Sequence, residues 1–288
     1  MPNEYTKLTQ AEFDKLKPIS NQVIIEIILP QLYETRESGL IMVKDYNLFI
    51  SKSQDSINKT DQSAPLDRVG KVVKVPDKLH WKERLDQRNP NFKEKYKSQD
   101  WKMDWKTTVE IIPGDMVAFD FHSAHHCPII QVEDKQYRVL EYQNLIVAKR
   151  RIYFATIMLL GLDQDELIKD GFSFHCDAYG SEPIYYEKII PLNGYCLFSR
   201  VKSKIESNLI VDHLENVDKK RGIVKYCGSR VEYFNKNYFD DIEINPGDEV
   251  IFKDEYECLL EDKSHFHMFD EELRYNQRKD ILGVITNN

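Results

Sequence analysis

One stretch of this sequence occurs twice: Ile112-Pro113-Gly114-Asp115-Met116-Val117-Ala118-Phe119, and then Asn245-Pro246-Gly247-Asp248-Glu249-Val250-Ile251-Phe252. In each copy a Pro-Gly-Asp turn leads into an apolar run that is typical of a buried strand. Proline presets φ at the turn, glycine adopts positive φ, and the aspartate side chain bonds back to the backbone, so the chain reverses there. The recurrence predicts that one β-structure is present in two copies.

Four further segments recur in the same order along the chain. The pairs are residues 18–25 with 191–198, 37–41 with 206–210, 70–72 with 222–224, and 145–147 with 281–283. The separation within a pair changes from 173 positions to 169, 152, 133 and finally 136, because one copy carries extra residues between the segments. Insertions confined to the gaps between apolar strands are typical of a shared scaffold with variable loops.

Strand patterns dominate the chain outside these pairs as well. Short β-branched or aromatic runs, separated by Gly, Pro, Asn and Asp, predict strands near residues 23–28, 69–75, 116–121, 137–140 and 145–148. Two short helices are predicted, over residues 9–16 and 163–169, and the charged residues 80–106 are expected to form a helical or irregular excursion between strands. The first has Thr9 at its N-cap and Glu12 at the capping-box position. We therefore expect a mainly β fold.

Length and composition limit the classes of function. The 288 residues are enough for about two domains, and 41% of them are hydrophobic, which supports a packed core. The net charge of -8 does not provide the broad cationic face that nucleic-acid binding needs. The most apolar run, residues 152–162, is shorter than the roughly 20 residues of a membrane span. We expect neither a nucleic-acid partner nor a membrane.

The cysteines and the first residues favour a cytoplasmic protein. The five cysteines include no C-x-x-C pair, so neither a zinc ribbon nor a thioredoxin motif is expected. The odd number and irregular spacing of the cysteines are compatible with a reducing compartment. Residues 1–5 show no basic segment followed by an apolar one, so no signal peptide is expected.

The order of the repeated motifs resembles the co-chaperonin (GroES-like) family, and it does so twice. The matching pieces are residues 38–42, 68–73, 113–119 and 144–148 in the first copy, and 207–211, 220–224, 246–252 and 280–284 in the second. The resemblance implies two tandem, partly open β-barrels with loop insertions. The first domain would cover residues 1–150, with a mobile loop at about 37–67 and an insertion at about 77–108. A connecting segment (151–187) and a second barrel (188–288) would follow.

The resemblance also implies a function in binding proteins and no catalysis. Members of the family form rings of barrels that cap a chaperonin, and each mobile loop inserts an aliphatic tripeptide into a groove of a chaperonin (GroEL-like) apical domain. By resemblance the chain would be a homo-oligomer without a cofactor that assists protein folding. The partner-binding residues would be Gly39, Leu40, Ile41, Met42, Leu209, Ile210 and Val211.

The sequence departs from the family pattern in ways that keep another interpretation open. The family's subunit has one barrel, Asn208 stands where the first copy has Gly39, and residues 77–108 do not resemble the family's roof hairpin. A phage-encoded structural or assembly protein that keeps the barrel without binding a chaperonin is the alternative, and its place would be the host cytoplasm. The triplet Leu40-Ile41-Met42 is also compatible with a buried strand, although the polar residues 51–65 favour a loop.

Two other kinds of site remain as hypotheses. The stretch containing His122, His125, His126 and Cys127 carries ligands that suit a transition metal, so a metal-dependent enzyme is a third hypothesis. A solvated turn explains the same residues, and His265 and His267 form a weaker candidate. The segment holding Trp81, Trp101 and Trp105 combines aromatic rings with cations, which suits stacking on single-stranded nucleic acid, but also packing within the protein.

Overall fold

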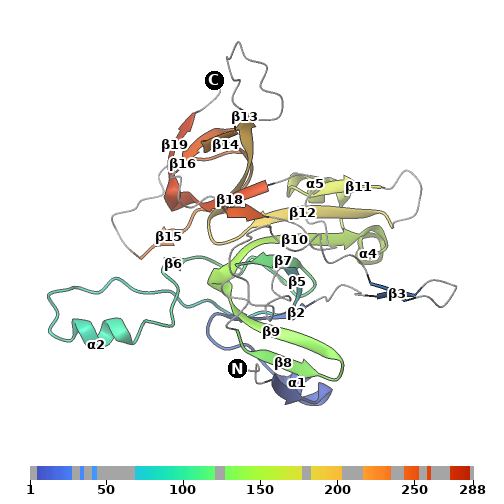
Figure 1. Ribbon diagram of the computed structural model, residues 1–288, viewed down its shortest axis with the longest axis horizontal. Coiled ribbons are helices and arrows are strands. Elements are labelled where there is room, and N and C mark those ends of the chain that lie inside the picture. The colour runs from blue at the N-terminus through green and yellow to red at the C-terminus, as the bar shows by residue number, and fades with distance from the viewer. Residues whose placement is uncertain are drawn as a thin grey trace, which may run out of the picture. The chain divides into compact units, whose positions relative to one another are not determined.

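The structure is a computed structural model and has a mainly β architecture (Figure 1). It describes residues 5–27, 33–35, 41–43, 69–120, 127–176, 183–202, 217–234, 243–252, 258–260 and 273–285. The chain divides into two compact units. Unit 1 contains Met1–Pro76, Ile111–Leu145 and Glu261–Asp270, and unit 2 contains Asp77–Glu110, Ile146–Leu260 and Glu271–Asn288.

Six strands of unit 1 form a sheet in the order β1-β8-β9-β2-β5-β7. Apart from the parallel pair β1 and β8, neighbouring strands are antiparallel. The predicted strands are confirmed here with small shifts of their ends. The bounds are β1 Tyr5–Leu8, β2 Gln22–Ile27, β5 Val69–Lys74, β7 Met116–Phe119, β8 Ile129–Val132 and β9 Lys135–Glu141.

Helix α1 (Gln10–Lys15) packs on this sheet and confirms the predicted capping box. The hydroxyl of Thr9 accepts from the backbone N–H of Glu12, and the carboxylate of Glu12 accepts from the backbone N–H of Thr9. Phe13 is the buried residue of the helix, and its ring stacks on Tyr137 at 4.3 Å. The ammonium of Lys74 donates to three carbonyl oxygens near the helix end, which holds α1 to β5.

Unit 2 contains three groups of strands. The largest is a six-stranded sheet in the order β17-β18-β13-β14-β16-β19. The second group consists of the neighbouring strands β10-β12-β11, which precede the six-stranded sheet in the sequence. The third group is the separate two-stranded sheet β6-β15. The bounds are β6 Trp105–Lys106, β10 Leu145–Tyr153, β11 Ser173–His175, β12 Tyr185–Pro191, β13 Tyr195–Lys202, β14 Val217–Cys227, β15 Glu232–Tyr233, β16 Glu249–Phe252, β17 Cys258–Leu260, β18 Leu273–Gln277 and β19 Ile281–Ile285.

The strand order of unit 1 recurs in unit 2. The neighbours β8-β9-β2-β5-β7 correspond to β17-β18-β13-β14-β16. Ile25 lies opposite Val72 in the first set, and Phe198 lies opposite Val224 in the second. Both pairings contain a register shift at the same place, between Ile24 and Ile25 and between Leu197 and Phe198. Ile25 and Phe198 are 173 positions apart and Val72 and Val224 are 152 apart, which are the separations found in the sequence repeat. The two copies therefore share the strand register and the β-bulge as well as the sequence motifs.

The two Pro-Gly-Asp turns have the same hydrogen bonds. Asp115 Oδ2 accepts from the backbone N–H of Ile112 at 2.9 Å, and Asp248 Oδ2 accepts from that of Asn245 at 2.8 Å. The glycine of each turn has positive φ, 103° at Gly114 and 96° at Gly247. Turn and strand are thus built by the same three residue types in both units.

The described strands do not form a closed barrel. Each compact unit is made of several separate stretches of the sequence, and the predicted domain boundaries stay a prediction. Residues 77–108, predicted as an insertion of the first copy, belong to unit 2, where β6 pairs with β15. Residues 151–187, predicted as a connection, contain two helices, α4 (Phe154–Leu160) and α5 (Gln164–Lys169), together with β11 and the first part of β12. The predicted helix at 163–169 is confirmed as α5, with Asp163 as its N-cap.

Candidate protein-binding surface

The first predicted binding segment is partly described. Gly39 and Leu40 lie outside the described residues, whereas Ile41 and Met42 belong to strand β4 (Ile41–Val43). This strand pairs antiparallel with β3 (Tyr33–Thr35), with Ile41 opposite Thr35. The second segment, Leu209, Ile210 and Val211, also lies outside the described residues. The binding role of both segments stays a prediction.

Most of the candidate metal-binding residues also lie outside the residues that the structure describes. His122, His125 and His126 belong to the part that is not described, as do His265 and His267. Cys127 is described and half-buried. Within the described ranges, no group of three or more His, Cys, Asp or Glu side chains could hold a metal ion.

The tryptophan-rich segment packs within unit 2. Trp105 is buried, its indole N–H donates to Asn193 Oδ1 at 3.1 Å, and its ring lies 6.2 Å from that of Tyr233. Trp105 and Tyr233 are also partners in the pairing of β6 with β15. Trp101, by contrast, is 48% exposed. For Trp105 these contacts favour packing over stacking on a nucleic acid.

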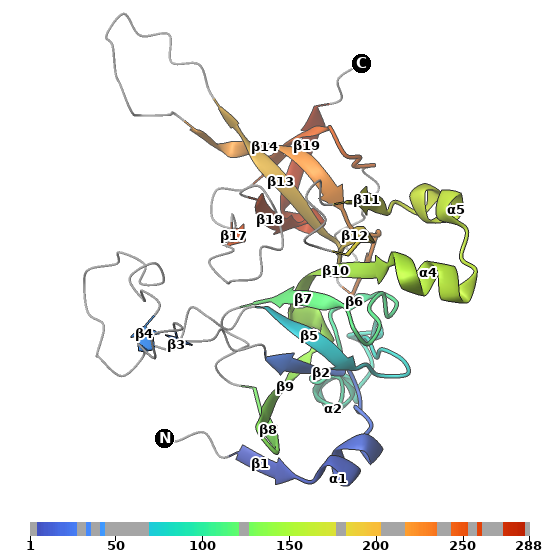
Figure 2. The ribbon, with the colours of Figure 1, turned by 90° about the vertical axis from the view of Figure 1, so that its right-hand side faces the viewer.

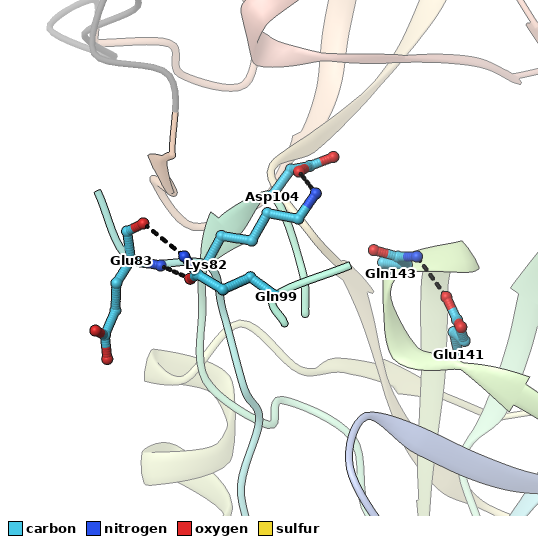
Figure 3. Close-up of polar contacts among 6 residues, drawn as sticks. All are labelled: Lys82, Glu83, Gln99, Asp104, Glu141 and Gln143. Atoms are coloured by element: carbon cyan, nitrogen blue, oxygen red, sulfur yellow. Dashed lines mark hydrogen bonds and ion pairs between the residues drawn. The ribbon is translucent and has the colours of Figure 1, made fainter. Parts of the chain in front are cut away.

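Polar contacts tie this segment together (Figure 3). Lys82 Nζ forms an ion pair with Asp104 Oδ1 at 2.7 Å. Gln99 lies beside Glu83 and both accepts from its backbone N–H at 2.6 Å and donates to its carbonyl oxygen. Burial of Lys82 lowers the pKa of its ammonium, but the hydrogen bond to Asp104 and the nearby negative charges, of which Asp104 is the main one, together raise it above the ordinary value. Figure 3 also shows the contact of Gln143 with Glu141 in unit 1.

Helices α4 and α5 share a small core with β12. Ile157 of α4, Leu167 of α5, Phe172 and Tyr186 form one buried cluster. The Tyr186 hydroxyl donates to Gln164 Oε1 at 2.9 Å, which fixes the start of α5 on the strand. Gly161 ends α4 with a φ of 64°, a left-handed conformation that glycine adopts without strain. Figure 2 shows the two helices joined by this short turn.

Helix α4 leaves three successive apolar side chains in solvent. Met158, Leu159 and Leu160 are 64%, 84% and 64% exposed, and Ile157 is the only buried residue of the helix. We call these three residues the α4 surface. Nearby elements of the same segment add exposed Leu162, Ile168 and Phe174. Exposed apolar groups gathered in this way are typical of protein or lipid contact sites.

Charged residues next to α4 stabilise the strands from which it projects. Glu187 of β12 accepts from Arg151 at 2.6 Å and pairs with Lys149 at 3.1 Å, both on β10. Burial disfavours the charge of Arg151, but the hydrogen bond and the charge of Glu187, together with the neighbouring tyrosines, raise its pKa above the ordinary value. The Arg151 guanidinium also lies 4.4 Å from the Tyr185 ring centroid. This network fixes β10 on β12, while α4 itself carries no charged residue.

Sequence reasoning weighed residues 152–162 only as a membrane span and did not recognise the α4 surface. The sequence does contain a signal for this surface. Residues 152–162 include no charged residue, whereas a short surface helix and its turns normally expose several charged side chains. The described part of the chain contains no helix that is both long and apolar enough to cross a membrane. Comparison with protein-family models found no match for the chain, and comparison with curated protein sequences found none either.

Proposed function

We propose that this protein is a co-chaperonin-like subunit that binds a chaperonin and assists protein folding, built from two tandem GroES-like barrels. The observation that carries the proposal is the repeated register. Ile25 opposite Val72 and Phe198 opposite Val224 flank the same bulge in two units that also share the Pro-Gly-Asp turn. This agreement supports two copies of one scaffold in the motif order that resembles the family.

The position of the aliphatic segments in the chain supports the same proposal. In the first copy, Leu40, Ile41 and Met42 fall between β2 and β5, which are neighbours in the sheet of unit 1. In the second copy, Leu209, Ile210 and Val211 fall between the corresponding neighbours β13 and β14. Each segment therefore belongs to the connection at which the family carries its mobile loop.

The physical basis of binding would be burial of these aliphatic side chains in an apolar groove of the chaperonin. Each fully buried side chain contributes about 1.5–3 kcal/mol, less the cost of ordering the segment. Several subunits of a homo-oligomer acting together would add avidity without new contacts. No catalytic group is needed for this function.

Capture of the purified protein on an immobilised GroEL-type chaperonin with ATP or ADP tests the proposal, with chaperonin ATPase as a second readout. We expect binding by the native chain and a loss of at least about tenfold when Leu40, Ile41 and Met42 are replaced by serine. The variant Leu209→Ser/Ile210→Ser/Val211→Ser shows whether the second copy also binds. Met158→Ser is the matched control and should bind like the native chain. No binding by the native chain at any nucleotide state would exclude the proposal.

The α4 surface favours a second candidate, a structural protein that uses the same scaffold for assembly with its own copies. Helix α4 has no charged residue, so two copies of it can pack without repulsion between like charges. Light scattering after size-exclusion chromatography tests this candidate. Leu159→Glu should dissociate the assembly while the free energy of unfolding stays unchanged. An oligomer that persists in this variant, or a native chain that is a monomer, contradicts it.

A further inference from the structure

Two cysteines face each other on adjacent strands of unit 2. Cys196 of β13 lies opposite Cys227 of β14, and their sulfur atoms are 2.9 Å apart. Neither cysteine forms a disulfide. Arg278 Nη1 donates to Cys227 Sγ at 2.8 Å and lies 3.4 Å from the carbonyl oxygen of Gly228. Cys196 and Arg278 are buried, with 0% and 3% of their surface exposed, and Cys227 is half-buried.

Unit 1 shows that the scaffold does not require these residues. The offsets of the repeat place Val23, Val75 and Tyr142 where unit 2 has Cys196, Cys227 and Arg278. Val23 and Tyr142 are fully buried, so the same positions are filled by apolar or aromatic side chains. Burying a guanidinium is costly unless polar groups satisfy it, and the Cys227 sulfur is one of the groups to which Arg278 donates. The change from Val, Val and Tyr to Cys, Cys and Arg therefore points to sulfur chemistry at this site.

The geometry suits a disulfide across the two strands. Directly opposite residues of an antiparallel pair have Cα atoms about 4.5 or 5.5 Å apart, depending on the hydrogen-bonding position. Both separations fall in the range of about 4.4–6.8 Å that disulfides occupy. A guanidinium beside a thiol stabilises negative charge on its sulfur, which is the form that reacts with oxidants. Cys227 has this contact and is the more accessible of the two.

We propose that Cys196 and Cys227 form a redox modification site in which hydrogen peroxide converts the two thiols into an intrachain disulfide. The Cys227 thiolate attacks one oxygen of the peroxide, an S–O bond forms, the O–O bond breaks, and the leaving hydroxide takes a proton to become water. The Cys196 sulfur then attacks the Cys227 sulfenic acid. The S–S bond forms, the S–O bond breaks, and the hydroxide leaves as water with the thiol proton. Two electrons pass from the thiols to one peroxide, and two water molecules result.

The disulfide would join the first residues of β13 to the end of β14 and so close a covalent loop of the chain between Cys196 and Cys227. Closing a loop of this kind restricts the unfolded chain and stabilises the folded one. All three tryptophans belong to unit 2, so their fluorescence reports on the melting of this unit. Oxidation should raise the melting temperature seen by tryptophan fluorescence by about 5–15 °C.

The test is mass spectrometry of the reduced, full-length protein after brief exposure to one equivalent of hydrogen peroxide and alkylation of the remaining thiols. We expect a species 2 Da lighter before alkylation, with a peptide that links Cys196 to Cys227. The variant Cys196→Val, which carries the residue of unit 1, should stop at a sulfenic acid on Cys227 that dimedone captures. Cys227→Val should leave Cys196 unmodified.

The exposed Cys176 is the internal reference for reactivity. Cys227 should oxidise at least about tenfold faster than Cys176, and Arg278→Met should remove most of this difference while Arg278→Lys retains part of it. Should the arginine variants not fold, the two valine variants still decide the matter. Oxidation of Cys227 no faster than that of Cys176, or no link between Cys196 and Cys227, overturns the proposal. This outcome is independent of chaperonin binding, because it is measured on the isolated protein.

Discussion

Gly70 and Gly222 lie at equivalent positions of the two units, and each faces a side chain of the neighbouring strand. A Cβ at Gly70 would lie 2.3 Å from Cγ2 of Ile25, and one at Gly222 would lie 2.5 Å from Cδ2 of Phe198. The sequence repeat identified both glycines as matching positions. Glycine is needed at both positions because the facing side chain comes very close at the bulge. The sequence does not reveal this close approach, since the facing residue is Ile25 in one copy and Phe198 in the other.

Replacement of Gly222 by alanine should destabilise unit 2. The new Cβ overlaps the buried ring of Phe198, and overpacking of this kind costs about 1–3 kcal/mol. Urea unfolding followed by tryptophan fluorescence measures the effect. Gly283→Ala is the matched control, since nothing lies within 4 Å of its Cβ position, and it should be close to neutral. Equal effects of the two substitutions would contradict the predicted overlap.

Glu110 gives unit 2 a pH-dependent contribution to stability. Burial raises its pKa above the ordinary value of 4.5, although the hydrogen bond from Ser229 lowers it in part. Because the folded protein holds this proton more tightly than the unfolded chain, stability is highest below the ordinary pKa and falls as pH rises through the folded value. Glu110→Gln should therefore raise the melting temperature at pH 7 and change it little at pH 4. A difference that is the same at both pH values would refute the assignment.

The helices show how far sequence alone reaches at the scale of elements. Helices α1 and α5 were both predicted, and for α1 the capping box, a local pattern, was recognised in the sequence. The pairing of β6 with β15 was not predicted, because strands of two residues carry no pattern that names a distant partner. For the same reason the sequence assigned residues 77–108 to the first copy. Helix α4 was missed since its apolar run lacks the amphipathic period of a surface helix.

The two faces of α4 should respond very differently to truncation. Ile157 is buried in the cluster with Leu167 and Tyr186, so Ile157→Ala should cost about 2–4 kcal/mol of the free energy of unfolding. Leu159 is 84% exposed, and Leu159→Ala should stay within about 0.5 kcal/mol at protein concentrations where the chain is dissociated. Chemical denaturation measures both. A large cost for Leu159→Ala in a monomer would show that its side chain is buried in solution.

At the scale of the whole molecule, the repeat accounts for most of the described strands. Two units share one strand order, one bulge and one turn, and the segments outside the shared set distinguish them. The sequence predicted two copies of one β-structure because the Pro-Gly-Asp turn and the other repeated segments occur twice in the same order. It could not fix the unit boundaries, since these depend on contacts such as Trp105 with Asn193 that join distant parts of the chain.

The proposed co-chaperonin-like function would make the chain an accessory of a larger assembly, so the central test of the proposal is made on that assembly. Electron microscopy of a GroEL-type chaperonin with nucleotide, mixed with the purified protein, addresses the claim directly. We predict additional density over the apical domains at one or both ends of the chaperonin cylinder, and its loss with Leu40, Ile41 and Met42 replaced by serine. Bare cylinders in the presence of excess native protein, with every nucleotide state sampled, would contradict the account.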